Sequence, residues 1–193
     1  MNKPLLLALS TAALALTGLT PQVVLAQPYV ELGAGMSRAD VDCAGTIRCD
    51  DTSAQARVTA GWSFGDSLAA EVTLAQIGKL SASAVVPMVG RVDADVRLRQ
   101  AGIGVASRLP LTDTLALTAR LGVASNQTRV SGTAGGMRTS DSQRNTAAYA
   151  GIGLSYALTP TVALGLNVEG TRVRYDGEDA NVTMAGLSVR TRF

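Results

Sequence analysis

The last thirteen residues of the chain, NVTMAGLSVRTRF, alternate between two kinds of side chain. Neighbouring side chains of a β-strand point to opposite faces, so a period of two predicts a strand with two different faces. One face carries Ala185, Leu187, Val189, Thr191 and Phe193, and the other carries Met184, Gly186, Ser188, Arg190 and Arg192. The first face suits lipid and the second a polar interior, as in the strands of a membrane-spanning barrel.

Seven earlier segments repeat this alternation. In residues 55–64, Trp62 and Phe64 share one face with alanine and valine, while Arg57 lies on the other. The predicted strands are residues 28–36, 55–64, 68–75, 96–109, 114–124, 148–158, 161–170 and 181–193. In the fourth strand the apolar residues move from even to odd positions after Leu98. This shift predicts a bulge near Gln100 or a later start of the strand.

The connections between these segments alternate in length. Residues 65–67, 110–113 and 159–160 form short turns, whereas residues 37–53, 77–95, 126–146 and 175–181 are predicted long loops. Short turns on one side and long loops on the other are typical of outer-membrane barrels. Five aromatic residues near the short-turn ends resemble one half of an aromatic girdle: Tyr29, Trp62, Phe64, Tyr156 and Phe193. We therefore predict an all-β protein, an eight-stranded antiparallel transmembrane β-barrel.

The first 26 residues have the pattern of a secretory signal peptide. They contain Lys3, an apolar run from Leu5 to Leu19, and a cleavage-like sequence that ends at Ala26. A membrane anchor is the alternative, but polar residues and Pro21 interrupt a run that is short for a span of ~20 residues. We expect cleavage between Ala26 and Gln27, so that residues 27–193 form the outer-membrane barrel of a Gram-negative cell.

The charge of the mature chain is nearly balanced. The sequence has 17 Lys and Arg, one of them Lys3, so 16 bases face 15 acids and the net charge is +1. Nucleic-acid-binding proteins carry a concentrated basic surface, so we expect no nucleic-acid partner. Cys43 and Cys49 are predicted to form a disulfide in a surface loop of the exported protein. A metal site is the alternative reading, which the absence of His disfavours; the nearby acids are expected to be solvated.

The chain resembles the small eight-stranded outer-membrane barrels, that is, the OmpA membrane domain and the OmpX, Ail and opacity types. The resemblance covers residues 27–193 and depends on the Phe193 strand, the AGW and GIG strand sequences and the YALTPTVAL turn. It implies that Leu187, Val189, Thr191 and Phe193 form the C-terminal signal read by the barrel-assembly machinery. Periplasmic chaperones during biogenesis, and outer-membrane lipid and lipopolysaccharide afterwards, are the implied partners of a monomer.

Seven charged residues are predicted to point into the barrel: Glu31, Arg57, Glu71, Arg120, Glu169, Arg190 and Arg192. Eight strands enclose little more than side-chain volume, and an unpaired buried charge is costly, so a packed ionic network is expected. A narrow pore whose selectivity these charges set is the alternative. Inward glycines, such as Gly104 and Gly151, are expected to make room for the arginines.

A lipid-modifying enzyme is a third hypothesis. The chain has no His, which excludes a Ser-His-Asp triad and a His general base. A Ser-Lys pair using Lys79 with Ser81 or Ser83 remains, but it lies in a predicted loop that would not desolvate the lysine. We therefore predict no catalytic residue, no cofactor and no metal.

The outer loops are predicted to carry the function. The apolar segment SASAVVPMVG (81–90) either adheres to a host or neighbouring cell, or only extends two strands beyond the membrane. Arg129, Arg138 and Arg144 could meet lipopolysaccharide phosphates. The predicted function is a structural or surface-interaction role, as an adhesin or in envelope integrity, exercised through these loops.

Overall fold

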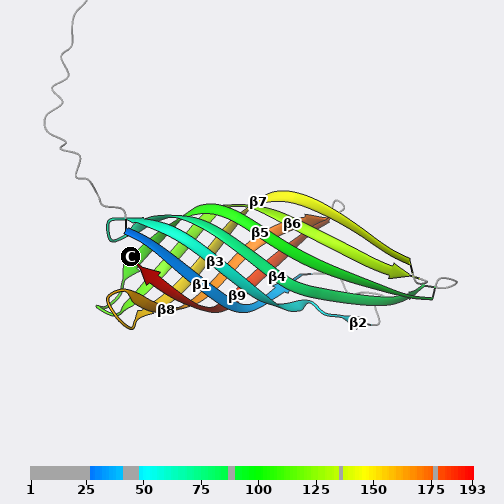
Figure 1. Ribbon diagram of the computed structural model, residues 1–193, viewed down its shortest axis with the longest axis horizontal. Helices are drawn as coiled ribbons and strands as arrows, with labels where there is room; N and C mark the ends of the chain where they lie inside the picture. The colour runs from blue at the N-terminus through cyan, green and yellow to red at the C-terminus, as the bar shows by residue number, and fades with distance from the viewer. Residues whose placement is uncertain (1–26, 41–47, 87–89, 135–136, 176–177) are drawn as a thin grey trace, which may run out of the picture.

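The computed structural model describes residues 27–40, 48–86, 90–134, 137–175 and 178–193. These contain nine strands: β1 (Gln27–Ala39), β2 (Arg48–Cys49), β3 (Thr52–Phe64), β4 (Leu68–Val86), β5 (Gly90–Pro110), β6 (Leu115–Ala134), β7 (Met137–Ala157), β8 (Val162–Tyr175) and β9 (Glu178–Arg192). Each strand pairs antiparallel with its neighbours, and pairing of β4 with β5 closes the ring (Figure 1). The short β2 pairs with the far part of β4. The prediction of an eight-stranded antiparallel barrel is confirmed.

Closure brings the first and last strands side by side. Leu32 of β1 pairs with Val189 of β9, and Phe193 donates its backbone N–H to the carbonyl of Pro28 at 3.0 Å. Residue 27 and the C-terminus therefore lie at the end of the barrel that carries the short turns (Figure 1). In the turn between β3 and β4, Gly65 has a φ of 69°, in the left-handed region that favours glycine. No helix in the described part of the chain is long and apolar enough to cross a membrane.

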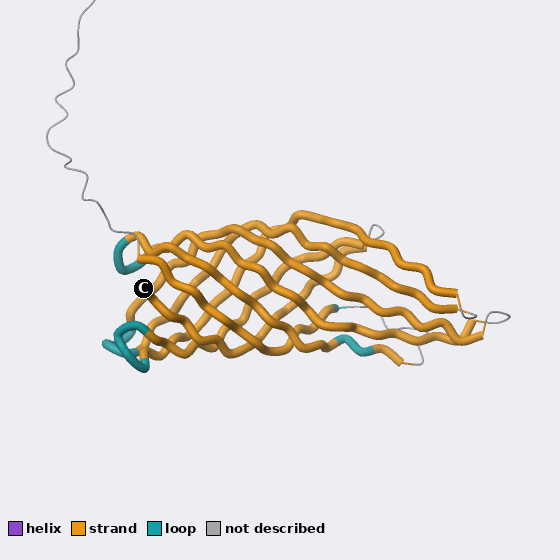
Figure 2. Tube along the Cα trace, in the orientation of Figure 1, coloured by secondary structure: helices purple, strands orange, loops and turns teal. Residues whose placement is uncertain are grey.

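Four neighbouring strands are much longer than the others. β4, β5, β6 and β7 have 19, 21, 20 and 21 residues, whereas β1 and β8 have 13 and 14. A membrane-spanning strand needs about 9–11 residues. The four strands therefore continue as a sheet beyond the barrel, at the end opposite the short turns (Figure 2).

Two of the predicted long loops are consequently wrong. Most of residues 77–95 and 126–146 is strand, paired from Lys79↔Arg97 to Val86↔Gly90 and from Asn126↔Asn145 to Ala134↔Met137. Their Ser, Thr, Gly and Arg residues have no clear alternation, and only the neighbouring strands supply the hydrogen bonds that order them. The predicted 175–181 loop is also shorter, because β9 begins at Glu178.

The predicted bulge near Gln100 is wrong as well. β5 pairs with β6 without interruption through Gln100↔Asn126, and the register shift lies in β4 between Ile77 and Lys79. Leu98 is an inward-facing residue, 5% exposed, and belongs to an apolar cluster inside the barrel. β5 therefore keeps the same inner and outer faces past Gln100. Leu98 is an apolar residue of the inner face, whereas the apolar residues at odd positions after it lie on the outer face.

The outer face has the apolar character that lipid requires. Its exposed residues include Leu74, Ile103, Leu121, Ile152 and Leu187. Trp62, Phe64, Tyr156 and Phe193 are also exposed, near the short-turn ends of their strands, as an aromatic girdle requires. Tyr29 does not belong to this girdle, because it is buried inside the barrel with 3% of its surface exposed.

Glycines make room for two tyrosine rings inside the barrel. A Cβ on Gly61 would overlap the ring of Tyr29, and a Cβ on Gly104 or Gly122 would overlap the ring or hydroxyl of Tyr149. The expectation that inward glycines mainly accommodate arginines is therefore wrong at Gly104. The interior is packed by aromatic rings over glycine as well as by charges.

Substitution of Gly61 tests this packing. A methyl group in Gly61→Ala would displace the buried Tyr29 ring, so we expect the free energy of unfolding to fall by about 1–3 kcal/mol. The control is Gly170→Ala, because no atom lies within 4 Å of the added Cβ. Urea titration in lipid vesicles measures both, and equal losses in the two variants would contradict the packing role of Gly61.

Candidate functional site

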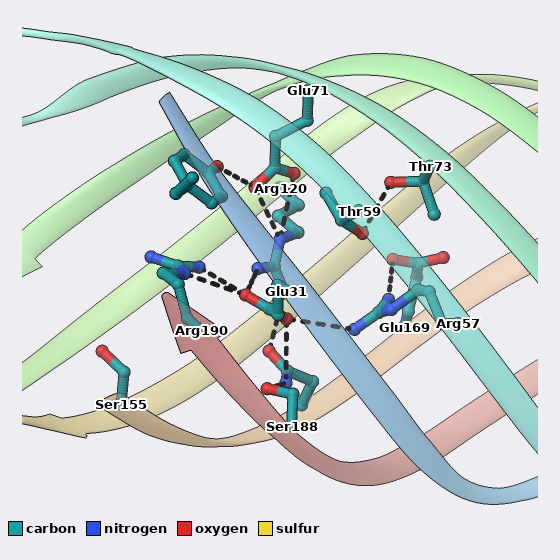
Figure 3. Close-up of polar contacts among 12 residues, drawn as sticks. Glu31, Arg57, Thr59, Glu71, Thr73, Arg120, Ser155, Glu169, Ser188 and Arg190 are labelled. Atoms are coloured by element: carbon teal, nitrogen blue, oxygen red, sulfur yellow. Dashed lines mark hydrogen bonds and ion pairs between the residues drawn. The ribbon is translucent and has the colours of Figure 1, made fainter. Parts of the chain in front are cut away.

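The interior of the barrel centres on one carboxylate. Glu31 of β1 is 2% exposed, and its Oε2 lies 2.7 Å from Nη2 of Arg120 and 2.7 Å from Nη2 of Arg190. The guanidinium of Arg57 lies 3.8 Å from the other oxygen of Glu31. Three arginines from β3, β6 and β9 thus surround a single glutamate (Figure 3).

Arg120 also joins a second carboxylate. Its Nε lies 3.1 Å from Oε2 of Glu71, and the hydroxyl of Tyr29 donates a hydrogen bond to the same glutamate. Arg120 donates from Nη1 to the side-chain oxygen of Asn167 at 2.7 Å. Asn167 in turn donates to the hydroxyl of Ser188 at 2.8 Å. The guanidinium of Arg120 is therefore bound to two carboxylates and to one amide oxygen.

The third acid, Glu169, pairs with Arg57. Nη1 of Arg57 lies 2.7 Å from Oε2 of Glu169, and the hydroxyls of Thr59 and Thr73 are 3.0 Å apart beside them (Figure 3). The network thus contains three carboxylates and three guanidiniums. A balanced, hydrogen-bonded set of charges is the condition under which burial of ions is tolerated.

An apolar cluster lies on the same inner face, toward the extended strands. Ile77, Leu98, Val182 and Met184 are buried together, with Leu80 and Val173 packed against them. A cavity beside Glu31 and Asn167 has a volume of about 10 Å³. Side chains thus pack closely at the level of the charges, and above it the apolar cluster lies among buried polar side chains that include Gln100 and Asn126.

Arg192 lies apart from this network. It is partly exposed and lines a cavity of about 360 Å³ at the short-turn end, together with Arg108, Asp66 and Asp113. The structure thus brings together six of the seven residues that the sequence suggested. Sequence reasoning assigned Tyr29 to the aromatic girdle and did not assign Asn167 or Ser188 to the network. The positions of all three on the inward face of their strands were the available signal.

The remaining predicted sites are only partly described. Ala26, Cys43 and the side chains of Cys49 and Arg138 lie outside the described residues, so cleavage and the disulfide stay predictions. Leu187 and Val189 face outward and Phe193 is 76% exposed, while Thr191 is half-buried. Their role as an assembly signal also stays a prediction. Among the described residues, no group of three or more Cys, Asp or Glu lies close enough to hold a metal ion.

Neutralising Glu31 tests the charge network. Glu31→Gln leaves Arg120 and Arg190 without their shared carboxylate, so we expect the free energy of unfolding to fall by about 3–5 kcal/mol. Urea titration of the barrel in lipid vesicles measures this loss.

Asp51→Asn is the matched control. Asp51 pairs with Arg38 at 2.9 Å on the exposed surface, and the Thr52 hydroxyl together with this arginine lowers the pKa of the Asp51 carboxyl. Solvated pairs of this kind contribute little to stability, so we expect almost no change. If Glu31→Gln unfolded at the same urea concentration as Asp51→Asn, the central role of Glu31 would be refuted.

Known proteins share this fold. The chain is similar to Ail, the attachment invasion locus protein of Yersinia pestis, with 17% identity, a TM-score of 0.56, and coverage of 86% of this chain and 98% of that one. Neisserial surface protein A is similar with 18% identity, a TM-score of 0.59, and coverage of 86% and 97%. The N-terminal barrel domain of Pseudomonas aeruginosa OprF has 15% identity, a TM-score of 0.53, and coverage of 87% and 99%.

No curated protein sequence matches the chain. The family model for the outer membrane protein beta-barrel domain matches residues 4–193, which is nearly the whole chain. Together with the closed ring and its apolar outer face, this match places the protein in the outer membrane. The chain belongs to the outer membrane protein beta-barrel domain family.

Proposed function

We propose that this protein is a non-conducting, non-enzymatic outer-membrane barrel that binds a partner at the cell surface, as an adhesin or in envelope integrity. The observation that carries this proposal is the four-stranded sheet of β4 to β7, which continues beyond the barrel. Pairing runs along all three interfaces of this sheet, as far as Val86↔Gly90, Val92↔Ala134 and Ala134↔Met137. A paired sheet presents a defined surface at little entropic cost on binding.

One edge of this sheet supports the proposal further. The pairing of β7 with β8 ends at Tyr149↔Thr171. The carbonyl of Ala148 points to the β8 side, where it accepts a hydrogen bond from the Thr171 hydroxyl, whereas Ala157 donates to Thr114 on the β6 side. Since backbone groups alternate in an antiparallel strand, those of Ser142 and Thr146 also point to the β8 side. No described strand pairs with them there.

An exposed strand edge of this kind recognises extended polypeptide. A partner segment adds as a further strand through main-chain hydrogen bonds, while adjacent side chains give specificity.

Ail, which has 16% identity in a second structure, has also been crystallised with the heparin analogue sucrose octasulfate. At least one barrel of this fold therefore binds a ligand.

The interior supports the absence of conduction. Ions would have to pass the buried side chains around Leu98 and the paired charges around Glu31, beside which a cavity has a volume of about 10 Å³. For catalysis, Lys79 was the candidate base, but its Nζ lies 2.8 Å from Asp95, to which Ser81 also donates at 3.1 Å. The side chains of Lys79 and Ser81 are thus both bound to the carboxylate of Asp95, which argues against a catalytic Ser-Lys pair.

We extend the proposal to biogenesis and to lipid. A signal peptide ends at Ala26, a disulfide joins Cys43 to Cys49, and the barrel-assembly machinery recognises the strand that ends at Phe193 after delivery by periplasmic chaperones. The mature protein is a monomer in contact with lipopolysaccharide. The apolar outward face of β9, with Leu187 and Val189 exposed, supports the assembly role.

Ser142→Pro tests the strand edge. Proline removes the N–H that points to the open side of β7 and leaves the hydrogen bonds to β6 intact. We expect adhesion of cells displaying this variant to fall to the level of cells without the barrel. Ser142→Ala keeps the N–H and serves as the control, for which we expect adhesion at the wild-type level. Full adhesion by Ser142→Pro would show that the partner does not bind at the β7 edge.

Adhesion by a shortened β6–β7 hairpin tests the outermost part of the extended sheet. Replacing residues 131–140 by Asn-Gly joins Val130 to Asp141, which face each other, so the register of the hairpin is kept. We expect this variant to assemble and to adhere less than the wild type, because it loses the outermost residues of β6 and β7 but keeps Ser142 and Thr146. Unchanged adhesion would mean that the part of the hairpin beyond Val130 is not needed for binding.

Recording across planar bilayers tests the packed interior. We expect no discrete conductance steps from the wild-type barrel, because six buried charges are paired across it. Steps whose size or ion selectivity changes in Arg120→Gln would contradict this and favour the narrow pore.

A further inference from the structure

A cavity of about 360 Å³ lies at the short-turn end of the barrel, the end that faces the periplasm in barrels of this type. Small-molecule sites commonly have volumes of ~300–1,000 Å³, so this cavity can hold a small ligand. Arg190 lines it, but Nε and Nη2 of this arginine already bind Oε2 of Glu31 at 3.0 and 2.7 Å. Recognition of a ligand therefore depends on the other polar side chains of the cavity.

Two further arginines of the cavity have no anionic partner. Arg108 is on β5 and Arg192 is on β9, both are partly exposed, and no ion pair engages either of them within the described ranges. The Nε atom of Arg108 is buried, and no described residue accepts a hydrogen bond from it. Burial of a charged group's donor without an acceptor is costly. This position therefore favours an acceptor that comes from outside the protein.

A buried hydroxyl lies beside Arg108. Thr118 of β6 faces Arg108 across the β5–β6 pair, is 2% exposed and lines the same cavity. Its Oγ1 also has no hydrogen-bond partner among the residues that the structure describes. A threonine hydroxyl donates one hydrogen bond, so Arg108 and Thr118 present two neighbouring donors on one wall of the cavity.

Arg192 lies on the opposite wall. Around the closed ring, β9 is four strands away from β5 in either direction. Because an eight-stranded lumen is about as wide as its side chains, arginines from both walls can reach one small ligand between them. A carboxylate has both oxygens on one side of its carbon, whereas the oxygens of a tetrahedral phosphate point toward both walls. Guanidinium groups also bind phosphate oxygens through paired hydrogen bonds.

We propose that this cavity binds a phosphate group, free or in a small phosphate monoester, between Arg108 and Thr118 on one wall and Arg192 on the other. The carboxylates of Asp66 and Asp113 also line the cavity, but they belong to exposed turn residues, where water and salt weaken their repulsion of an anion. The cavity and the extended sheet are at opposite ends of the barrel. Phosphate binding therefore does not require the surface partner of the proposed function.

Titration calorimetry of the purified barrel with inorganic phosphate, in a non-ionic detergent, tests this site. R108Q and R192Q each remove one charged donor, so we expect each variant to bind phosphate about tenfold more weakly than the wild type. Thr118→Val removes the hydroxyl and keeps the shape and charge, and we expect binding about fivefold weaker. Heat-modifiable gel mobility shows whether each variant is folded.

Two control variants separate the site from the total charge of the barrel. Arg38 does not line the cavity, so we expect R38Q to bind phosphate like the wild type. Asp113→Asn removes a repulsive charge and leaves the turn intact, because the Thr112 hydroxyl accepts the turn's hydrogen bond from Leu115 at 3.0 Å. We expect this variant to bind phosphate about two- to fivefold more tightly.

The choice of anion tests the ligand class. Inorganic phosphate and glycerol phosphate are both expected to bind, and the tighter of the two identifies the form that the cavity prefers. Acetate is expected to bind at least about tenfold more weakly, because it cannot reach donors on both walls. Absence of phosphate binding, wild-type affinity in R108Q and R192Q, an equal loss in R38Q, weaker binding by Asp113→Asn, or equal affinity for acetate would each overturn the proposal.

Discussion

The structure depends on the neutralisation of charge inside a closed and narrow barrel. Closing eight strands leaves a lumen about as wide as the side chains that fill it, so a charged side chain there has only other side chains as partners. Glu31 meets this constraint by binding Arg120 and Arg190 at 2.7 Å while Arg57 lies at 3.8 Å. β3, β1 and β9 are neighbours in the ring, whereas β6, which carries Arg120, lies across the barrel from them, so the network ties opposite walls together.

The filling of the lumen supports the proposal that partners bind on the outside of the barrel. Charges occupy one level of the interior, tyrosine rings pack over glycines such as Gly61, and at the next level the cluster around Leu98 lies among buried polar side chains. In the proposed function, the interior stabilises the barrel, and partners bind at the outer face or at the sheet beyond the barrel. Both surfaces are formed by the same four strands, β4 to β7. Their extra length carries the unpaired edge of β7 beyond the barrel.

Strand alternation accounts for how much of the fold and site could be predicted from the sequence. The inward positions of Glu31, Arg57 and Glu169 follow from parity alone, as do the outward positions of Trp62 and Phe193. The extended strands could not be predicted, because Ser140 and Thr139 have no local preference and are ordered by pairing with Ser131 and Gly132. The position of Tyr29 was misjudged since an aromatic near a strand end suits either a girdle or, opposite a glycine, the interior.

By itself, then, the sequence determined the strands, their two faces and the type of barrel, since a period of two is a local property that any neighbouring strand respects. The tertiary structure alone decided which charges are partners, where the register shifts and how far each strand extends. Glu31 and Arg190 are 159 residues apart, and Arg192, two residues from Arg190, lies outside the network although it shares the same strand face. Such choices depend on the height and angle at which strands meet around the closed ring, which no local pattern records.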